Sequence, residues 1–137
     1  MTQINAYLIF NGQCREAMTF YKNCLGGELN LQTVAESPMA PDCPAAMQQN
    51  ILHSTLTNGG LVLLGSDMGP STGRSVGNNV TLSLDCSSEE EINKFYKGLS
   101  DGGNADQPLH KFFAGMIGQL TDKYGVIWNL YYNNVPN

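Results

Sequence analysis

The chain has 137 residues, of which 42% are hydrophobic and 14% are charged. This length is usual for one domain and is large enough to bury a hydrophobic core. Twelve acidic residues against seven basic ones give a net charge of −5, which argues against nucleic acid or an anionic membrane as a partner, because both require a basic surface. No apolar stretch approaches the ~20 residues that a membrane-spanning helix needs.

The first ten residues, MTQINAYLIF, contain a short apolar run with no positive residue before it. This pattern is typical of a first strand and not of a signal peptide, so we expect a cytoplasmic protein. Apolar residues then recur at helical spacing and stop at Gly26-Gly27, which predicts a helix that buries one face. The stripe consists of Cys14, Ala17, Met18, Tyr21 and Leu25.

Two segments are rich in turn-forming residues, one within the first half of the chain and one between the two halves. Residues 34–50 hold three prolines and few strand formers. We interpret this segment as a mobile excursion or lid, with disorder as the alternative. Residues 65–77 hold four glycines and a proline, which predicts a linker between two modules at about residues 68–76.

The second half predicts another amphipathic helix. Ser88 and Glu91 have the spacing of a capping box, and acidic residues at 89–91 suit the positive end of the helix dipole. The apolar stripe consists of Ile92, Phe95, Tyr96 and Leu99.

The two halves repeat one pattern of strand, helix and Gly-Gly turn. NAYLIF at residues 5–10 matches NVTLSL at 79–84, and both Phe-Tyr-Lys and Gly-Gly recur at offsets between 74 and 76 residues. We therefore predict one domain of two repeated modules, residues 1–67 and 77–137.

Strand alternation assigns side chains to two faces of the predicted sheets. The face that the helices cover is expected to hold apolar residues, namely Ala6, Leu8, Phe10, Val80, Leu82, Leu84, Trp128 and Leu130. The opposite face is expected to hold Asn5, Tyr7, Leu61, Leu63, Asn79, Asn129 and Tyr131. Amides mixed with aromatic and leucine side chains favour a concave ligand-binding face over plain solvent exposure.

Several short motifs occur in order along almost the whole chain. They include Tyr7-Leu-x-Phe10-Asn11-Gly12, Glu16-Ala17-Met18-x-Phe20-Tyr21, Leu25-Gly26-Gly27, Gly65-Ser66-Asp67, Gly77-Asn78-Asn79, Leu99-Ser100-x-Gly102-Gly103 and Asp122-Lys123-Tyr124-Gly125-Val126-x-Trp128. Together they resemble the PhnB-like branch of the vicinal oxygen chelate superfamily, which also contains glyoxalase I, bleomycin-resistance proteins and extradiol dioxygenases. The resemblance implies an α+β fold of two tandem βαβββ modules, whose curved mixed sheets form a cup, commonly completed in a homodimer.

In metal-dependent members of that superfamily the cup holds a divalent ion on His, Glu or Gln side chains. Carried over by position, the four ligands fall on Asn5, Leu63, Asn79 and Asn129. Three amides and a leucine offer no anionic or imidazole ligand, so we expect no metal at these positions. In the absence of a ligand, the asparagines would bond to each other and to water.

Other candidate residues have both a structural and a functional interpretation. His53 precedes the Gly59-Gly60 turn, where PhnB-like chains often have a His, and the sequence names no partner for it. His110 is expected on a surface loop. Cys86 lies near the start of the second helix, but no paired histidine marks it as a nucleophile, and the four cysteines form no metal-binding or disulfide pattern. Asp67 and Asp122 are interpreted as turn caps, and no cofactor motif is present.

The leading hypothesis is a metal-free protein that binds a small organic molecule in its cup and forms a homodimer. One alternative is a lyase, isomerase or dioxygenase of the glyoxalase superfamily that uses displaced ligands such as His53. Another is a structural dimer without a ligand. Members of this branch are sometimes labelled ubiquinone-related methyltransferases, but the sequence shows no feature for binding a methyl donor. The identity of the ligand cannot be deduced from the sequence.

Overall fold

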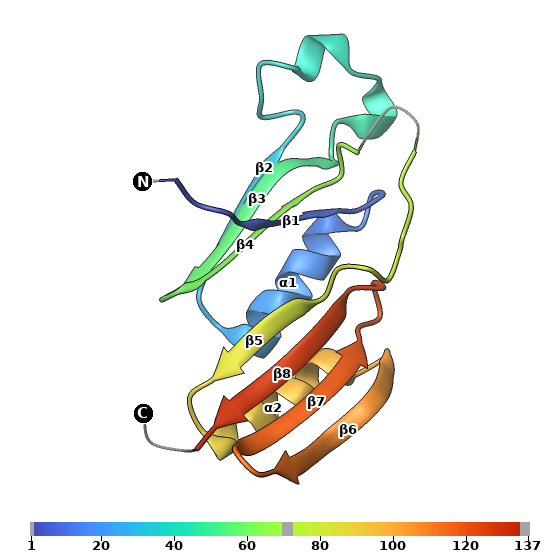
Figure 1. Ribbon diagram of the computed structural model, residues 1–137. Coiled ribbons are helices and arrows are strands. Elements are labelled where there is room, and N and C mark those ends of the chain that lie inside the picture. Colours follow the sequence, from blue (N-terminus) through green and yellow to red (C-terminus); the bar gives the residue numbers. More distant parts are fainter. Residues whose placement is uncertain (1, 70–72, 135–137) are drawn as a thin grey trace. The chain divides into compact units, whose positions relative to one another are not determined.

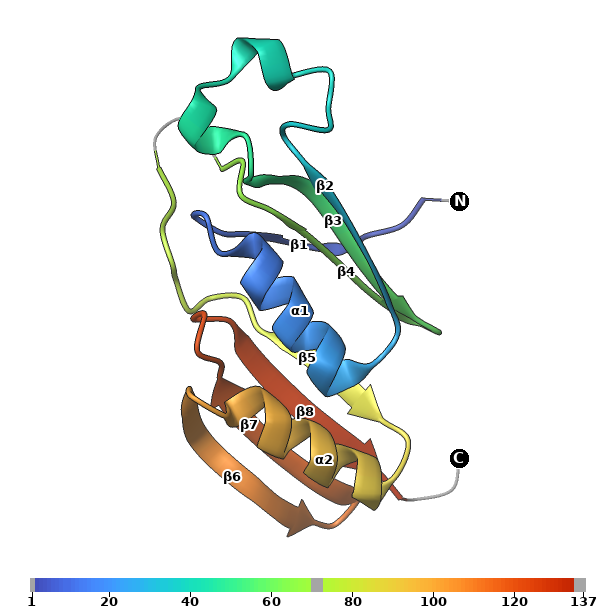
Figure 2. The ribbon, with the colours of Figure 1, turned by 180° about the vertical axis from the view of Figure 1, so that it is seen from behind.

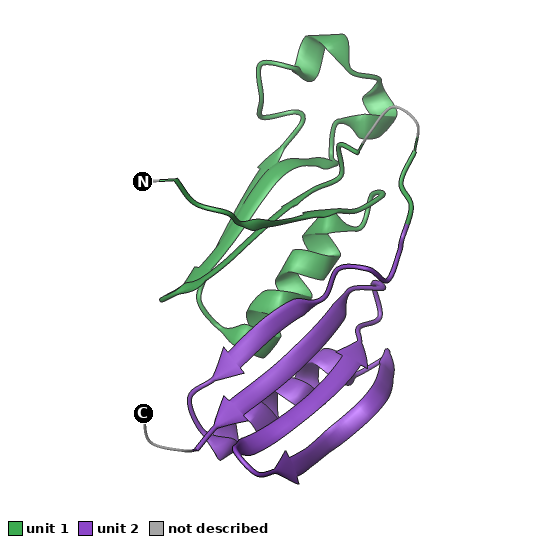
Figure 3. Cartoon of the chain, in the orientation of Figure 1, with its two compact units in different colours: residues 1–75 green, residues 76–137 purple. Residues whose placement is uncertain are grey.

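The computed structural model describes residues 2–69 and 73–134, so part of the predicted linker, residues 70–72, lies outside the described residues. The chain divides into two compact units, Met1–Ser75 and Val76–Asn137, which Figure 3 colours green and purple. No helix among the described residues has the length and apolar character that crossing a membrane requires.

The described part of unit 1 folds as a βαβββ module (Figure 1). Its main elements are β1 (Ala6–Ile9), α1 (Cys14–Leu25), β2 (Glu28–Thr33), β3 (Ile51–Asn58) and β4 (Leu61–Ser66). The strand order in the sheet is β1-β4-β3-β2. β1 runs parallel to β4, whereas the β2–β3 and β3–β4 pairs are antiparallel.

Unit 2 repeats this arrangement. Its elements are β5 (Leu82–Cys86), α2 (Glu89–Ser100), β6 (Asn104–Phe112), β7 (Gly115–Thr121) and β8 (Ile127–Asn133). The order is β5-β8-β7-β6, with β5 parallel to β8 and the other pairs antiparallel. The predicted α+β fold, with two βαβββ modules and two four-stranded mixed sheets among the described residues, is therefore confirmed.

Each helix covers one face of its own sheet, as Figure 2 shows from behind. All five residues predicted for the stripe of α1 are buried. On α2, Ile92, Tyr96 and Leu99 are buried and Phe95 is half-buried. The predicted capping box is present, because Ser88 Oγ accepts from the backbone N–H of Glu91 at 3.0 Å, although the Glu91 carboxylate accepts from Ser87 N and not from Ser88 N.

The repeated glycine pairs have the same physical cause in both units. A Cβ on Gly27 would collide with the carbonyl oxygen of Thr57 on β3, and a Cβ on Gly103 would collide with the carbonyl oxygen of Thr121 on β7. The chain therefore passes so close to the third strand of each module, β3 or β7, that a side chain cannot be accommodated.

Residues 34–50 form a hydrogen-bonded arm beyond the ends of β2 and β3 (Figure 1). It contains two short 3₁₀ helices, η1 (Ala40–Asp42) and η2 (Ala45–Met47). The side-chain amide of Gln48 donates to the carbonyl oxygens of Ala40 and Cys43, at 2.9 and 3.0 Å. These bonds connect the two short helices of the arm.

The predicted face of β4 is wrong. Leu63 pairs with Ala6 on β1 and with the fully buried Leu56 on β3, and directly paired side chains share one face. Two residues further along β4, a Cβ on Gly65 would meet the sulfur of Met18 on α1. Leu63 and, by alternation, Leu61 therefore lie on the helix-covered face, and Leu63 is only 4% exposed.

Burial under the helices is also less complete than the pattern predicts. Phe10, Trp128 and Leu130 are buried, whereas Leu8, Leu82 and Leu84 are half-buried. The half-buried residues belong to β1 and β5, which are edge strands of their sheets. Val80 precedes β5 and is 70% exposed, so its predicted burial is wrong.

Candidate functional site

The open face of unit 1, defined as the sheet face opposite α1, carries a mixed row of side chains. Tyr7 pairs with Leu64, Leu64 with Thr55, and Thr55 with Asn30, so one row crosses all four strands. Tyr7 is 49% exposed, and Leu64 and Thr55 are half-buried. A phenol, an aliphatic chain, a hydroxyl and an amide are therefore presented side by side.

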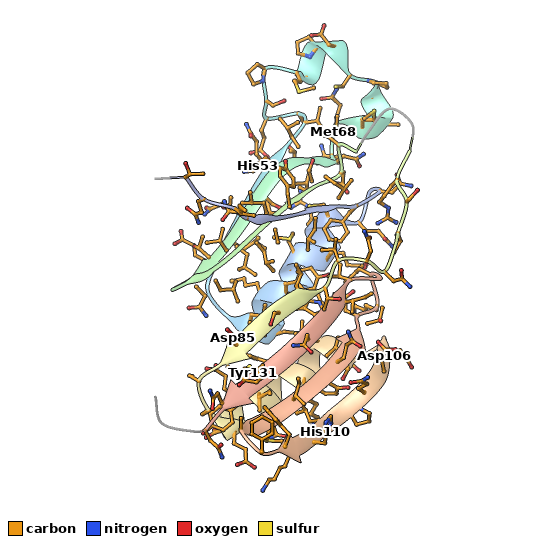
Figure 4. The ribbon with its side chains drawn as sticks, viewed as in Figure 1. His53, Met68, Asp85, Asp106, His110 and Tyr131 are labelled. Carbon is orange, nitrogen blue, oxygen red and sulfur yellow. The ribbon has the colours of Figure 1, made fainter. Side chains whose placement is uncertain are left out.

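His53 lies on the same face and contacts Tyr7. The Tyr7 hydroxyl is 3.3 Å from Nδ1 of His53, and the two rings meet edge to face with centroids 5.8 Å apart. These residues come from β1 and β3, which are separated by β4, so the contact spans the middle of the sheet. On its other side, His53 pairs with Gln32 of β2. Figure 4 labels His53 among the side chains of unit 1.

The open face of unit 2, opposite α2, has a polar row and an aromatic row. The polar row runs across the sheet through Ser83, Asn129, Gln119 and Gln107. The aromatic row consists of Asp85, Tyr131, Ile117 and His110. Figure 4 labels Asp85, Tyr131 and His110 on three strands of this unit.

Tyr131 is the centre of the aromatic row. It pairs with Asp85 on one side and Ile117 on the other, and its ring contacts that of Phe112, with centroids 5.8 Å apart. Tyr131 and Asn129 are both half-buried, so each has one accessible side. This face can pack against an apolar group and bond to a polar one.

The structure brings together some of the residues proposed from sequence and not others. Tyr7 and His53 share the open face of unit 1, and Asn129 and Tyr131 share that of unit 2. Asn5 and Asn79 are exposed and precede β1 and β5, respectively. Asn5 accepts a hydrogen bond from the Gln3 side chain at 2.9 Å.

Sequence reasoning missed several residues of the two open faces, namely Asn30, Gln32, Thr55, Leu64, Asp85, Gln119 and Ile117. Alternation along each strand shows which of its side chains share a sheet face. Only the register between the strands shows which of the two faces the helix leaves uncovered. His110, expected on a loop, lies on β6, is exposed, and has Nδ1 3.0 Å from the Pro108 carbonyl oxygen.

The residues at the superfamily's metal-ligand positions do not fit a metal ion. Leu63 is buried on the helix-covered face, and its open-face neighbours Val62 and Leu64 are aliphatic too. Asn5, Asn79 and Asn129 supply only neutral amides, whereas zinc, nickel and iron sites use imidazole, thiolate or carboxylate. Among residues 2–69 and 73–134 there is no group of three or more His, Cys, Asp or Glu side chains that could hold a metal.

Burial disfavours the thiolate form of two of the four cysteines. The four cysteines, all among the described residues, form no disulfide with one another, and Cys14 and Cys86 are buried. Burial raises the pKa of the Cys86 thiol to about 12, and the nearby carboxylates of Glu91 and Asp85 act in the same direction. Burial likewise raises the pKa of Cys14 to about 11. The raised pKa supports the interpretation of Cys86 as an unreactive thiol, because only a thiolate attacks efficiently.

Asp67 and Asp122 serve the fold, as predicted for turn caps. Asp67 accepts hydrogen bonds from the backbone N–H groups of Gly12, Cys14 and Ile51, at 2.8 to 3.0 Å. It therefore ties the start of α1 to the start of β3. Asp122 has the corresponding role in the turn between β7 and β8.

Comparison with known proteins agrees with this fold. Residues 2–131 match the family described as 3-demethylubiquinone-9 3-methyltransferase. Protein YjdN of Escherichia coli is 32% identical over 135 residues, which cover 91% of each chain. The crystal structure of protein PA1353 from Pseudomonas aeruginosa is 34% identical, with a TM-score of 0.86, and the match covers 97% of this chain and 98% of that one.

Two further solved structures extend the likeness. A putative 3-demethylubiquinone-9 3-methyltransferase, PhnB protein, from Bacillus cereus is 25% identical with a TM-score of 0.71, and the match covers 96% of this chain and 99% of that one. A glyoxylase/bleomycin resistance protein/dioxygenase domain from Frankia shares the fold at 14% identity and a TM-score of 0.65, with 100% of this chain and 96% of that one covered.

The two βαβββ modules define the fold of a glyoxalase/bleomycin resistance/dioxygenase domain. The family match and the likeness to the PhnB protein assign the chain to the PhnB-like branch of that class. Within it, the chain belongs to the family described as 3-demethylubiquinone-9 3-methyltransferase. The resemblance stated from the sequence motifs is thereby confirmed.

Proposed function

We propose that this chain binds a small, neutral, partly aromatic organic molecule on the open faces of its sheets, without a metal ion. The observation that carries the proposal is the composition of those faces. In unit 1 one row crosses the sheet from the exposed Tyr7 through Leu64 and Thr55 to Asn30. In unit 2 the half-buried Tyr131 lies beside Ile117 of β7 and two residues along β8 from Asn129.

These side chains suit a ligand with both apolar and polar parts. Tyrosine rings and aliphatic chains provide contact area, while amides supply donors and acceptors whose directions orient the ligand. Within this proposal Tyr7 and His53 contact a ligand on the open face of unit 1, and Asn129 and Tyr131 contact a ligand on the open face of unit 2. Asn5 and Asn79 contribute from the starts of β1 and β5.

Two of the residues predicted from sequence to contact the ligand are not part of the proposed site. Leu61 and Leu63 belong to the helix-covered side of the unit 1 sheet, so their place as an apolar wall is taken by Leu64.

The chemistry of the donors supports the metal-free part of the proposal. A neutral amide oxygen offers a dipole but no charge, so three amides would leave a divalent cation nearly uncompensated. The alternative of a lyase, isomerase or dioxygenase requires imidazole or carboxylate ligands in a new arrangement around His53. No such cluster occurs in the part of the chain that the structure describes.

The proposal also includes a cytoplasmic homodimer. Each sheet has edge strands with backbone groups that no strand of its own sheet pairs, and a second copy of the chain can cover such edges.

The test is a thermal-shift screen of purified protein against small aromatic carbonyl compounds, S-adenosylmethionine and divalent metal ions. We expect stabilisation by one or more aromatic compounds, unchanged by added chelator. For a confirmed ligand, Asn129→Ala should weaken binding by about 5- to 150-fold, the cost of one lost hydrogen bond to a desolvated partner. Lys94→Ala, on the exposed side of α2, is the matched control and should leave binding unchanged.

Other outcomes of the same screen would replace the proposal. About one equivalent of zinc, nickel or iron in chelator-free protein would restore the metalloenzyme alternative. Binding of S-adenosylmethionine alone would favour the activity in the family's description. No stabilisation by any compound would favour a structural dimer.

A further inference from the structure

His53 and Tyr7 form a contact whose chemistry determines what the open face of unit 1 offers to a ligand. The Tyr7 hydroxyl lies 3.3 Å from Nδ1 of His53. In a neutral imidazole one ring nitrogen is a donor and the other an acceptor, so whichever role Nδ1 takes decides the role of Nε2.

The relative acidities of the two groups favour one direction of this hydrogen bond. In general, a phenol is the better proton donor and a neutral imidazole nitrogen is the better acceptor, because the phenol oxygen shares its lone pair with the ring. This difference predicts that the Tyr7 hydroxyl donates and that Nδ1 of His53 accepts. The proton of the imidazole then lies on Nε2, which has no hydrogen-bond partner among the described residues.

His110 is an internal contrast, since the sequence contains only two histidines. Its Nδ1 lies 3.0 Å from the carbonyl oxygen of Pro108. A carbonyl can only accept, so Nδ1 of His110 donates and its Nε2 carries a lone pair. The same reasoning predicts opposite tautomers for the two histidines.

The charges on the strands of unit 1 indicate whether the ligand group bound by His53 is neutral or anionic. The four strands of unit 1, all within the described residues, carry one acidic residue, Glu28, and no Lys or Arg. Glu28 pairs with Thr57, near the end of the sheet away from His53. A neutral carbonyl oxygen therefore suits the Nε2–H donor better than a carboxylate, because these strands carry no cation and the guanidinium of Arg74 donates to the Ile9 carbonyl oxygen at 3.3 Å.

We propose that the Nε2–H group of His53 binds a carbonyl oxygen of the ligand, and that Tyr7 is a positioning residue that fixes the tautomer which makes this possible. The inference rests on the proposed function, and it adds the group that the ligand must carry. It also assigns His53 and Tyr7 different roles toward the polar group of the ligand, since His53 touches that group and the Tyr7 hydroxyl acts on it through His53, while the Tyr7 ring supplies contact area.

The first test needs no ligand. Two-bond ¹H–¹⁵N spectra of the full chain, recorded at a pH at which the imidazoles are neutral, distinguish the two tautomers of each histidine. We expect Nε2–H for His53 and Nδ1–H for His110, with signals assigned through His53→Gln and His110→Gln. Tyr7→Phe should reduce the tautomer preference of His53 and leave His110 unchanged. An Nδ1–H tautomer at His53 would overturn the inference and leave the proposed function intact.

The second test uses three probes of similar shape, namely acetophenone, benzoate and ethylbenzene. We expect acetophenone to shift the His53 ring signals and to bind more tightly than benzoate, while ethylbenzene leaves the Nε2–H signal unchanged. His53→Leu should weaken acetophenone binding at least about 5-fold, and His53→Gln, which retains an N–H donor, should recover part of the loss.

The outcomes separate the two proposals. If acetophenone shifts Asn129 and Tyr131 but not His53, the inference fails and the proposed function stands. If none of the probes perturbs either face, and the thermal-shift screen also finds no ligand, both fail. If benzoate binds as tightly as acetophenone, the neutral-carbonyl assignment is wrong.

Discussion

The carboxylate of Asp122 accepts a hydrogen bond from the indole Nε1 of Trp128 at 2.9 Å, inside unit 2. The same carboxylate accepts from the backbone N–H groups of Tyr124 and Val126, at 2.8 and 3.1 Å. Asp122 is 3% exposed and Trp128 is 2% exposed. One buried side chain therefore fixes both the turn between β7 and β8 and the orientation of the largest side chain in the unit.

This relationship predicts that Asp122→Ala destabilises the protein strongly. Three donors lose their acceptor, and we expect a loss of roughly 2–4 kcal/mol in the free energy of unfolding. Asp122→Asn retains one acceptor oxygen and should cost less. Trp128 is the single tryptophan, so its fluorescence during urea unfolding reports the change. Equal midpoints for wild type and Asp122→Ala at the same protein concentration would show that the bonds contribute nothing.

A second prediction concerns the two faces of β4. Leu63 is 4% exposed beneath α1, whereas Leu64 is half-buried on the open face. Leu63→Ala should therefore lower stability by about 2–4 kcal/mol, the usual cost of a buried leucine, and Leu64→Ala by clearly less. Leu64→Ala should lower ligand affinity more than Leu63→Ala does. Urea titrations and binding measurements on both variants check this pair, and a larger stability loss at Leu64 would reverse the assignment of faces.

A third prediction concerns the glycine pairs. Gly103→Ala would place a methyl group against the backbone of β7, so the chain must shift, and we expect a loss of roughly 1–3 kcal/mol. Gly60→Ala is the matched control, because no heavy atom lies within 4 Å of its Cβ position. Thermal unfolding of both variants tests the comparison. If Gly103→Ala is as stable as Gly60→Ala, close contact with the strand backbone is not the reason for the repeated Gly-Gly pairs.

The helices and their buried stripes could be predicted from sequence because helical spacing and caps are local signals. Ser88 with Glu91 and the stripe from Cys14 to Leu25 needed no knowledge of distant contacts. The internal repeat then indicated two modules of the same type, since the second glycine of each pair meets the same kind of strand backbone.

The residues of the open faces could be predicted only in part, because the face on which a strand's side chains lie depends on the register with the neighbouring strands. The run Leu61 to Leu64 is apolar at every position, so alternation alone does not show which residues the helix covers. The contact between Tyr7 and His53 was also invisible, since it joins residues 46 positions apart across an intervening strand. Asn79 was misplaced on a strand because β5 begins only at Leu82.

A fourth prediction follows from the buried thiols. Burial is the main reason that the pKa of Cys14 is raised from 9.0 to about 11 and that of Cys86 to about 12. The unfolded thiols ionise near pH 9, while the folded ones stay neutral, so their stabilising effect is complete below pH 9 and is lost as pH rises toward 11–12. We expect the urea midpoint to fall between pH 9 and 10.

Two double variants isolate this effect. Cys14→Ala with Cys86→Ala should flatten the pH dependence between pH 9 and 10, whatever it does to overall stability. Cys24→Ala with Cys43→Ala should retain the slope, because these cysteines are only half-buried. Alkylation followed by mass spectrometry should modify Cys24 and Cys43 faster than Cys14 and Cys86. A slope that the first double variant does not change would remove the thiols as its cause.

The last prediction is that the protein is a homodimer whose contact includes exposed apolar side chains. Phe113, between β6 and β7, is 96% exposed, as is Ile4, and Val80 is 70% exposed. Exposed aromatic and aliphatic groups of this size favour association, because their burial removes apolar surface from water. Light scattering at micromolar concentration should give twice the mass of the chain. Phe113→Ser should shift the protein toward monomer, whereas Lys94→Ala on α2 should not. A monomeric mass for the wild-type protein would contradict the prediction and leave each sheet edge without the proposed cover.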